Sequence, residues 1–158
     1  MSEEILEIEG VVLKTLTTHC DERGFFRELI RCTDPFFMEG FGQLSHSKMY
    51  PDVIKAWHIH KTQVDWWYVP MGCLKVGLAD RRPESASYGK TLTLFLGEDR
   101  EAQLLKIPPG VAHGCKAIGG VAHLFYVTSC VYNLEEEGRI AHDDAAIGYD
   151  WLRGAEIK

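Results

Sequence analysis

Long apolar stretches are absent from this chain of 158 residues, and basic residues are few. No hydrophobic run approaches the roughly 20 residues that cross a bilayer, and the opening Met1-Ser2-Glu3-Glu4 is acidic, unlike a basic secretory leader. We therefore expect a cytoplasmic protein with no membrane partner. Lys and Arg number 17 against 23 Asp and Glu, which gives a formal net charge of -6. Because nucleic-acid binding needs a basic surface, we also expect no nucleic-acid partner.

Cysteine is too scattered to form a disulfide framework or a zinc ribbon. The five cysteines are odd in number and never occur as C-x-x-C: Cys20, Cys32, Cys73, Cys115 and Cys130. We expect reduced, mostly buried thiols. With 46% hydrophobic and 25% charged residues, the chain has the composition of a single compact domain over residues 1–158.

Helical periodicity is also nearly missing, and only residues 34–39 and 98–101 hint at a helical turn. Short segments rich in Val, Leu, Phe, Tyr and Trp are interrupted by Gly, Pro or Asp, which is typical of an all-β protein. The expected strands are 11–17, 24–31, 42–48, 54–59, 64–70, 73–80, 91–96, 102–107, 113–117 and 122–131. Many short strands closed into two sheets predict a jelly-roll barrel, the double-stranded β-helix of cupins. We expect the charge runs at 99–101 and 135–137 to be solvated loops.

The clearest functional signal is the pair His58 and His60. Alternate residues of a strand face the same side, so both imidazoles should point to one place. Asp65 on the next strand and His113, which follows a Pro-Pro-Gly turn, could complete a polar cluster. We therefore expect the three imidazoles to converge inside one barrel cavity.

Six sequence blocks occur in order along nearly the whole chain: D-E-R-G-F-F-R-E at 21–28, Q-L-S-H-S at 43–47, K-A-W-H at 55–58, S-Y-G-K at 87–90, I-P-P-G-V-A-H-G at 107–114 and D-D-A-A-I-G-Y-D-W at 143–151. In order and spacing they resemble the dTDP-4-dehydrorhamnose 3,5-epimerase family of the cupin superfamily. The resemblance implies an isomerase that acts on a nucleoside-diphosphate 4-keto-6-deoxysugar in deoxysugar or polysaccharide biosynthesis. Such an epimerase removes a proton next to the carbonyl, forms an enolate and returns a proton to the opposite face, with no cofactor required.

The same resemblance implies roles for individual residues. His58 matches the base, Tyr132 the proton donor and Tyr126 a further active-site tyrosine. Both tyrosines should share one face, because they are an even number of residues apart on an expected strand. The implied substrate-binding positions are Arg23, Glu28, Gln43, Lys55 and His113. In the family, the N-terminal segment around 23–28 reaches into the neighbouring subunit of a homodimer.

Three departures from the family pattern bear on catalysis. The lysine that would stabilise the enolate is expected seven positions before Gly72, and Asp65 stands there. The carboxylate that orients the base lies, in the family, beyond the D-W segment, and residues 152–158 offer no obvious replacement. His60 occupies a position where the family commonly has glutamine.

These substitutions resemble a different pattern, that of metal-binding cupins: H-x-H, a carboxylate, Gly, and later P-x-G-x-x-H. This resemblance implies a site for a divalent transition metal (Fe, Mn, Ni, Co or Zn), with the ligands His58, His60, Asp65 and His113. Such an ion could polarise a substrate oxygen as a Lewis acid. Two alternatives to the epimerase therefore stay open: a metal-dependent cupin, either an oxygenase or a metal-assisted isomerase, and a noncatalytic sugar-binding relative.

Overall fold

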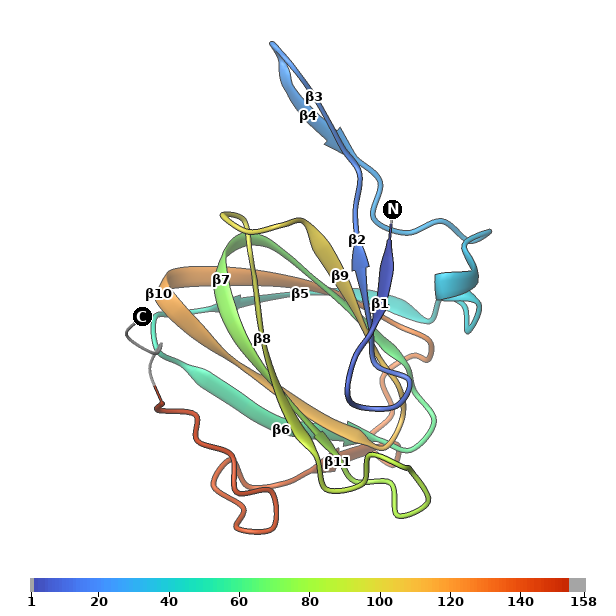
Figure 1. Ribbon diagram of the computed structural model, residues 1–158, viewed down its shortest axis with the longest axis vertical. Helices are drawn as coiled ribbons and strands as arrows, with labels where there is room; N and C mark the ends of the chain where they lie inside the picture. Colours follow the sequence, from blue (N-terminus) through green and yellow to red (C-terminus); the bar gives the residue numbers. More distant parts are fainter. Residues whose placement is uncertain (1, 154–158) are drawn as a thin grey trace.

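The computed structural model describes residues 2–153 and is built almost entirely of strands (Figure 1). The elements are β1 (Glu3–Ile5), β2 (Val12–Thr15), β3 (Thr18–Asp21), β4 (Gly24–Arg27), the 3₁₀ turn η1 (Pro35–Phe37), β5 (Gln43–Met49), β6 (Ile54–His60), β7 (Asp65–Asp80), β8 (Thr91–Gly97), β9 (Gln103–Ile107), β10 (Val111–Thr128) and β11 (Glu137–Arg139). The predicted all-β class is confirmed. Over the described range, no helix has the length and apolar character needed to cross a bilayer.

Two long antiparallel strands, β7 and β10, form the centre of the barrel. They pair from the Val111 and Asp80 end to the Thr128 and Asp65 end. β8 and β9 both pair with β7, whereas β5 and β6 both pair with β10, so each long strand belongs to two parts of the sheet. The sheet therefore wraps around on itself, as Figure 1 shows, and gives the predicted jelly-roll barrel.

Each long strand replaces two shorter strands of the sequence prediction. Residues 64–70 and 73–80 were expected as separate strands, as were 113–117 and 122–131. The break at Gly72 is a bend and not an end: Gly72 has a φ of 75°, and a Cβ there would lie 2.2 Å from the carbonyl oxygen of Val121. Glycine thus marks the close approach of β7 to β10, where the register shifts.

Other expectations are corrected at the local level. Residues 98–101 form a turn without a helix, and only Pro35–Phe37 of the 34–39 segment is helical, capped by the Asp34 side chain. β1, β3 and β11 were not predicted, because three or four residues carry too little periodicity to be recognised. All five cysteines are free, as expected, but only Cys115 is buried.

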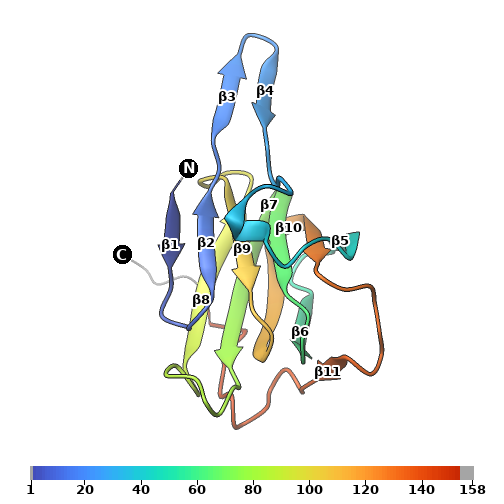
Figure 2. The same ribbon diagram turned by 90° about the vertical axis from the view of Figure 1, so that its right-hand side faces the viewer.

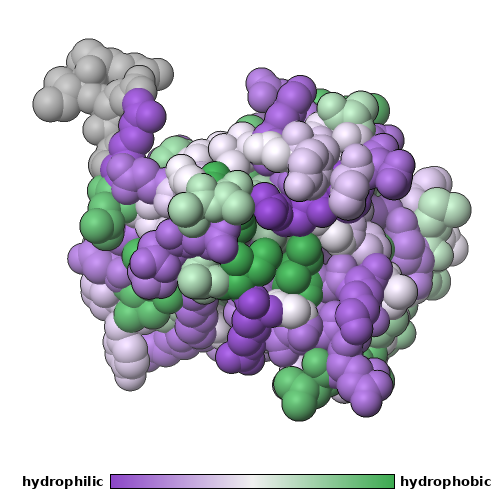
Figure 3. All heavy atoms as spheres, turned by 90° about the horizontal axis from the view of Figure 1, so that it is seen from below, coloured by the Kyte–Doolittle hydropathy of each residue, from purple (hydrophilic) through white to green (hydrophobic). Residues whose placement is uncertain are grey.

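Core packing holds β6, the strand that carries His58 and His60, in place. Trp57, the residue before His58, is 1% exposed, and its ring lies 4.8 Å from that of Trp151, centroid to centroid. The D-W segment near the carboxyl end therefore packs against β6 from outside the main core. Seen from below, this end of the molecule shows hydrophobic atoms between hydrophilic side chains (Figure 3).

One hairpin stands apart from the barrel. β3 and β4 pair only with each other and project away from the other strands in both ribbon views (Figures 1 and 2). Phe25 and Phe26 on this hairpin are 64% and 63% exposed. The hairpin therefore presents two large apolar side chains to the outside of the single chain.

Candidate active site

A cavity of about 340 Å³ opens in the barrel among β5, β6, β7, β10 and the segment 132–139. Its volume falls in the range of small-molecule sites. The predicted convergence of His58, His60 and His113 is confirmed, because all three line this cavity. The other lining residues are Gln43, Ser47, Lys55, Gln63, Asp65, Trp67, Cys115, Leu124, Tyr126, Thr128, Tyr132, Asn133, Glu137 and Arg139.

His58 is held by a carboxylate from a distant part of the chain. Its Nδ1 lies 2.5 Å from Oε1 of Glu137, whose side chain is only 8% exposed. Burial alone would raise the pKa of Glu137, but the hydrogen bond and charge interaction with His58, together with the charges of Arg139 and His60, outweigh burial and leave that pKa below its usual value. Glu137 is therefore ionised at neutral pH. An Nδ1–H donated to it leaves Nε2 of His58 with a free lone pair.

Backbone pairing brings the two residues together. β11 pairs antiparallel with β6, placing Glu137 opposite His60 and Arg139 opposite His58. Gly138 lies between them against Ile59, where a Cβ would approach Ile59 Cγ2 to 2.7 Å. Arg139 also lies close to the dyad, with its Nε 3.5 Å from Glu137 Oε1.

The expectation that residues 135–137 form a solvated loop is therefore wrong for Glu137, as is the inference that the base lacks a carboxylate partner. Its neighbour Glu136 is also engaged: its Oε1 accepts hydrogen bonds from the backbone N–H and hydroxyl of Thr62. No local signal marks Glu137, because 79 residues separate it from His58. Only recognition that 137–139 can pair with 58–60 would have revealed the dyad.

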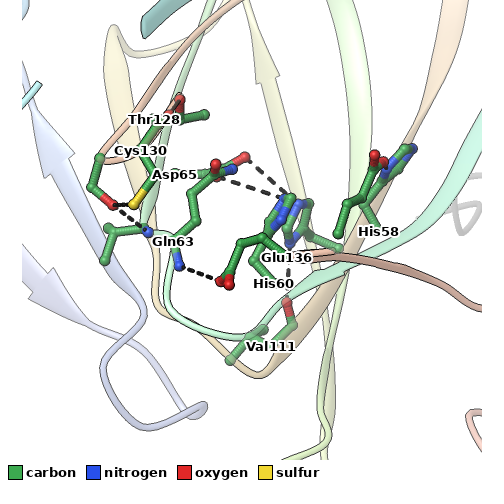
Figure 4. A network of polar contacts seen from close by, with 12 residues as sticks. His58, His60, Gln63, Asp65, Val111, Thr128, Cys130 and Glu136 are labelled. Carbon is green, nitrogen blue, oxygen red and sulfur yellow. Dashed lines mark hydrogen bonds and ion pairs between the residues drawn. The ribbon is translucent and has the colours of Figure 1, made fainter. Parts of the chain in front are cut away.

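A second cluster lies on the inner side of the cavity. Nε2 of His60 is 3.9 Å from Oδ1 of Asp65, and Nε2 of His113 is 3.6 Å from Oδ2. Figure 4 shows the Asp65 carboxylate facing His60, with Gln63 beside it. One ring nitrogen of each imidazole and one carboxylate oxygen all lie within 4.8 Å of one another. Three of the four residues implied as metal ligands therefore converge here, whereas His58 is bound to Glu137 instead.

Hydrogen bonds fix the orientation of this second cluster. Asp65, which is 3% exposed, accepts from Gln63 Nε2 at 2.8 Å and from Trp67 Nε1 at 3.2 Å. Nδ1 of His113 donates to the carbonyl of Val111 at 3.0 Å, so its Nε2 faces Asp65. Burial lowers the pKa of His113 to about 4, against the opposing pull of Asp65, and the ring is neutral at physiological pH.

The predicted tyrosines and polar residues lie toward the opening of the cavity. Tyr126 is on β10, but β10 ends at Thr128, so the argument from strand parity does not apply to Tyr132. Both tyrosines nevertheless line the cavity. The backbone N–H of Tyr132 donates to Gln43 Oε1 at 3.0 Å, which ties the loop after β10 to β5. Lys55 donates to Ser47 Oγ at 2.7 Å on the same side.

Two predicted substrate residues lie elsewhere. Arg23 is at the tip of the β3–β4 hairpin, with its side chain 81% exposed and paired to Asp21. Glu28 follows β4 and forms an ion pair with Arg31. Neither residue lines the cavity of its own chain. A contribution from them to a site of this kind would have to be made to a second copy.

The chemistry that this arrangement supports is proton transfer. A histidine oriented by a buried carboxylate is a base for a carbon acid, and a tyrosine hydroxyl on the same cavity is a proton donor. Lys55 and Arg139 supply positive charge near the opening.

Comparisons with known proteins agree with this chemistry. The dTDP-4-dehydrorhamnose 3,5-epimerase family model matches residues 5–158. The chain is 46% identical over 147 residues to the spore coat polysaccharide biosynthesis protein SpsL of Bacillus subtilis. These aligned residues make up 91% of this chain and 96% of the relative. It is 30% identical over 152 residues to the dTDP-4-dehydrorhamnose 3,5-epimerase of Escherichia coli. This alignment covers 92% of this chain and 82% of the Escherichia coli enzyme.

Solved structures show the same relationship. A dTDP sugar isomerase from Desulfovibrio desulfuricans superimposes with a TM-score of 0.89 at 31% identity, covering 97% of both chains. NovW, a 4-keto-6-deoxy sugar epimerase from Streptomyces spheroides, superimposes with a TM-score of 0.88 at 25% identity, covering 99% of this chain and 82% of NovW.

Proposed function

Because this chain belongs to the dTDP-4-dehydrorhamnose 3,5-epimerase family, we propose that it epimerises a dTDP-linked 4-keto-6-deoxysugar next to the carbonyl. The observation that carries the proposal is the His58 and Glu137 dyad at the wall of a sugar-sized cavity. The noncatalytic alternative drew on the apparent loss of two functions, the carboxylate partner of the base and the lysine that would stabilise the enolate. Glu137 supplies the first, and Asp65 still stands at the position of the second.

The reaction follows from the residues around the cavity. The 4-carbonyl acidifies the protons on the neighbouring carbons, and Nε2 of His58 removes one of them. The electron pair of the broken C–H bond forms an enolate, and Tyr132 returns a proton from the opposite face. Glu137 remains ionised throughout, holding the imidazole in the correct tautomer and stabilising the imidazolium that forms.

Substrate binding would use residues from two chains. Gln43 and Lys55 line the opening of the cavity, where an amide and a cation can hold the sugar and its diphosphate. Arg23 and Glu28 are assigned to the cavity of a second copy in a homodimer. The projecting hairpin and its exposed Phe25 and Phe26 support this arrangement.

The setting proposed is deoxysugar supply for a surface polysaccharide, in the cytoplasm. The relative named for spore coat polysaccharide biosynthesis supports the pathway class. Five free cysteines, two of them exposed, are compatible with a reducing compartment.

Solvent isotope exchange tests the proposal. The protein is incubated in deuterated water with dTDP-4-keto-6-deoxyglucose, and with CDP- and GDP-linked analogues, and deuterium at C3 and C5 is followed by NMR. We expect incorporation with the dTDP sugar. His58→Ala should abolish it, and circular dichroism will show whether the variant is folded, because the substitution leaves the buried Glu137 carboxylate without its imidazole partner. Absence of incorporation by the wild-type protein with every sugar would refute the proposed activity.

A metal-dependent function is the second candidate, and the convergence of His60, Asp65 and His113 favours it. In its metal-assisted isomerase form it is compatible with the epimerase, because the ion would act on the same substrate.

A further inference from the structure

We propose that His60, Asp65 and His113 bind one divalent first-row transition-metal ion, such as Zn²⁺, Fe²⁺ or Co²⁺, and that His58 is not among its ligands. The binding site stands on its own geometry. Its catalytic role, holding the enolate oxygen of the substrate, rests on the epimerase function proposed above.

The donor atoms have nearly the spacing that a metal requires. Ligands about 2.0–2.2 Å from an ion in tetrahedral or octahedral geometry lie about 3.0–3.5 Å from one another. The imidazole Nε2 atoms are 3.6 and 3.9 Å from the Asp65 oxygens, and the whole set fits within 4.8 Å. These separations exceed the range of an N–H···O hydrogen bond. An ion would have to draw the two imidazole–carboxylate pairs together by a few tenths of an ångström, and the widest donor pair, up to 4.8 Å apart, by about 1 Å.

The local charge favours a cation at the centre. The hydrogen bond from Nδ1 of His113 to Val111 leaves its Nε2 as a lone pair directed at Oδ2 of Asp65. Two acceptors therefore face each other in a buried position. Among residues 2–153, these two imidazoles are the only titratable basic side chains within 4.0 Å of the Asp65 carboxylate, and no Lys or Arg neutralises it. A divalent ion between these donors would neutralise a carboxylate that is otherwise costly to bury.

The surrounding hydrogen bonds are those of a supported metal site. The Val111 carbonyl orients the His113 ring, while Gln63 and Trp67 each donate to one oxygen of Asp65. Metal-ligating histidines and carboxylates are oriented in this way by a second layer of hydrogen bonds. Two histidines and one carboxylate also leave coordination positions open for a substrate oxygen.

His58 lies beside this site but serves another purpose. Its ring is nearly parallel to that of His113, with 6.4 Å between the centroids, and its Nδ1 is committed to Glu137. A carbonyl oxygen on the ion would therefore place the adjacent C–H bond near His58. The proton moves to Nε2 of His58, the C–H electron pair becomes the new C–C double bond, and the carbonyl π pair moves onto the oxygen held by the ion. No oxidation or reduction occurs.

Metal binding can be measured without any turnover. The chelator-stripped protein is titrated with Co²⁺ and with Zn²⁺, using calorimetry for both and visible absorption for Co²⁺, and elemental analysis gives the content of the protein as purified. We expect one ion per chain. Asp65→Asn and His60→Gln should each weaken binding by about 100-fold or more, and circular dichroism will show whether each variant is folded. His60 is the less buried ligand, so His60→Gln provides the answer if Asp65→Asn does not fold.

Two control variants define the site. His58→Ala should bind Co²⁺ as the wild type does. This result would distinguish the proposed three-ligand site, which lacks His58, from the four-ligand site of the H-x-H cupin pattern. His46→Ala removes one member of the exposed pair His46 and His123, whose ring nitrogens are 2.8 Å apart, and should also leave binding unchanged. Loss of binding in His46→Ala, with full binding in Asp65→Asn and His60→Gln, would mean an adventitious ion only and would overturn the proposal.

The catalytic role is tested by deuterium exchange with and without metal. We expect the stripped protein to lose at least 10-fold in exchange rate and to regain it with Zn²⁺ or Co²⁺. Full activity of the stripped protein would overturn the role of the ion. If metal binds as predicted but no metal state exchanges deuterium, the epimerase proposal fails while the metal site stands.

Discussion

Nδ1 of His58 and Oε1 of Glu137 lie 2.5 Å apart, although 79 residues separate them in the chain. This contact is made because β11 adds to the edge of β6 and turns the Glu137 side chain inward. The proposed base is therefore oriented by the segment that follows Tyr132, the proposed proton donor. Both proton-transfer groups depend on the conformation of residues 129–137.

Removing the charge of Glu137 should lower turnover without weakening substrate binding. In Glu137→Gln, the side-chain amide can donate to Nδ1 and favour the tautomer that carries its proton on Nε2, which cannot act as a base. We expect kcat to fall about 10²- to 10⁴-fold with KM nearly unchanged. Steady-state kinetics on the dTDP sugar measures both constants, and Glu137→Asp should recover part of the rate.

The adjacent residue provides the control for this prediction. Glu136→Gln removes a carboxylate that binds Thr62 and Gln63 and does not contact His58. It should leave kcat within a few-fold of the wild type. Equal losses in both variants would mean that Glu137 acts only by holding the loop in place.

Tyr132→Phe should separate exchange from inversion. If His58 removes the proton and Tyr132 returns one to the other face, the phenyl variant can still form the enolate. Deuterium then enters from the side of His58, and the configuration is retained. We expect the epimerised product to fall at least 100-fold while NMR still detects deuterium in unreacted substrate. Tyr50→Phe, at a tyrosine that is 66% exposed and does not line the cavity, is the matched control and should invert at the normal rate. Inversion by Tyr132→Phe would rule out this donor.

Local geometry explains which parts of the site were predictable. The parity of a strand places His58 and His60 on one side, a short-range pattern, and the Pro-Pro-Gly turn before His113 marks where β10 begins. The position of His113 opposite His58 depends on the pairing of β10 with β6, and only the motif spacing indicated it. Glu137 did not, because the three residues of β11 have no periodicity of their own and depend on pairing with β6. For a similar reason the sequence predicted two strands where β7 is continuous through Gly72. A glycine bend inside a strand has the same sequence pattern as a turn between strands.

Asp80 makes a contribution to stability that is separate from the cavity. This fully buried carboxylate accepts hydrogen bonds from Arg82, Ser85 and Ser87. Burial would raise its pKa, but these hydrogen bonds together outweigh burial and hold the pKa far below the usual range. The stabilisation is therefore complete above the unfolded carboxyl pKa of about 3.9 and is lost as pH falls toward the folded value.

The substitution that tests this is Asp80→Asn, which leaves Arg82 partly buried without its partner. We expect the free energy of unfolding to fall by about 3 kcal/mol at neutral pH, and the difference from the wild type to shrink below about pH 4. Urea denaturation from neutral pH to about pH 3 measures it. Asp52→Asn, at an acid whose side chain is 80% exposed, should change stability by less than about 0.5 kcal/mol at any pH. A gap for Asp80→Asn that stays constant with pH would contradict the assignment.

Shared sites in a homodimer predict that two inactive variants can restore each other. If Arg23 of one chain completes the cavity that contains His58 of the other, a mixed dimer of Arg23→Ala and His58→Ala chains has one intact site and one doubly altered site. Random pairing then leaves about a quarter of all sites intact. Co-expression with two affinity tags, isolation of the mixed dimer and the isotope-exchange assay measure the recovery. His58→Ala mixed with Glu137→Gln is the control, because both residues belong to the same chain's site and no pairing restores it. Recovery in that control, or none in the first mixture despite isolated mixed dimers, would place Arg23 outside the neighbouring site.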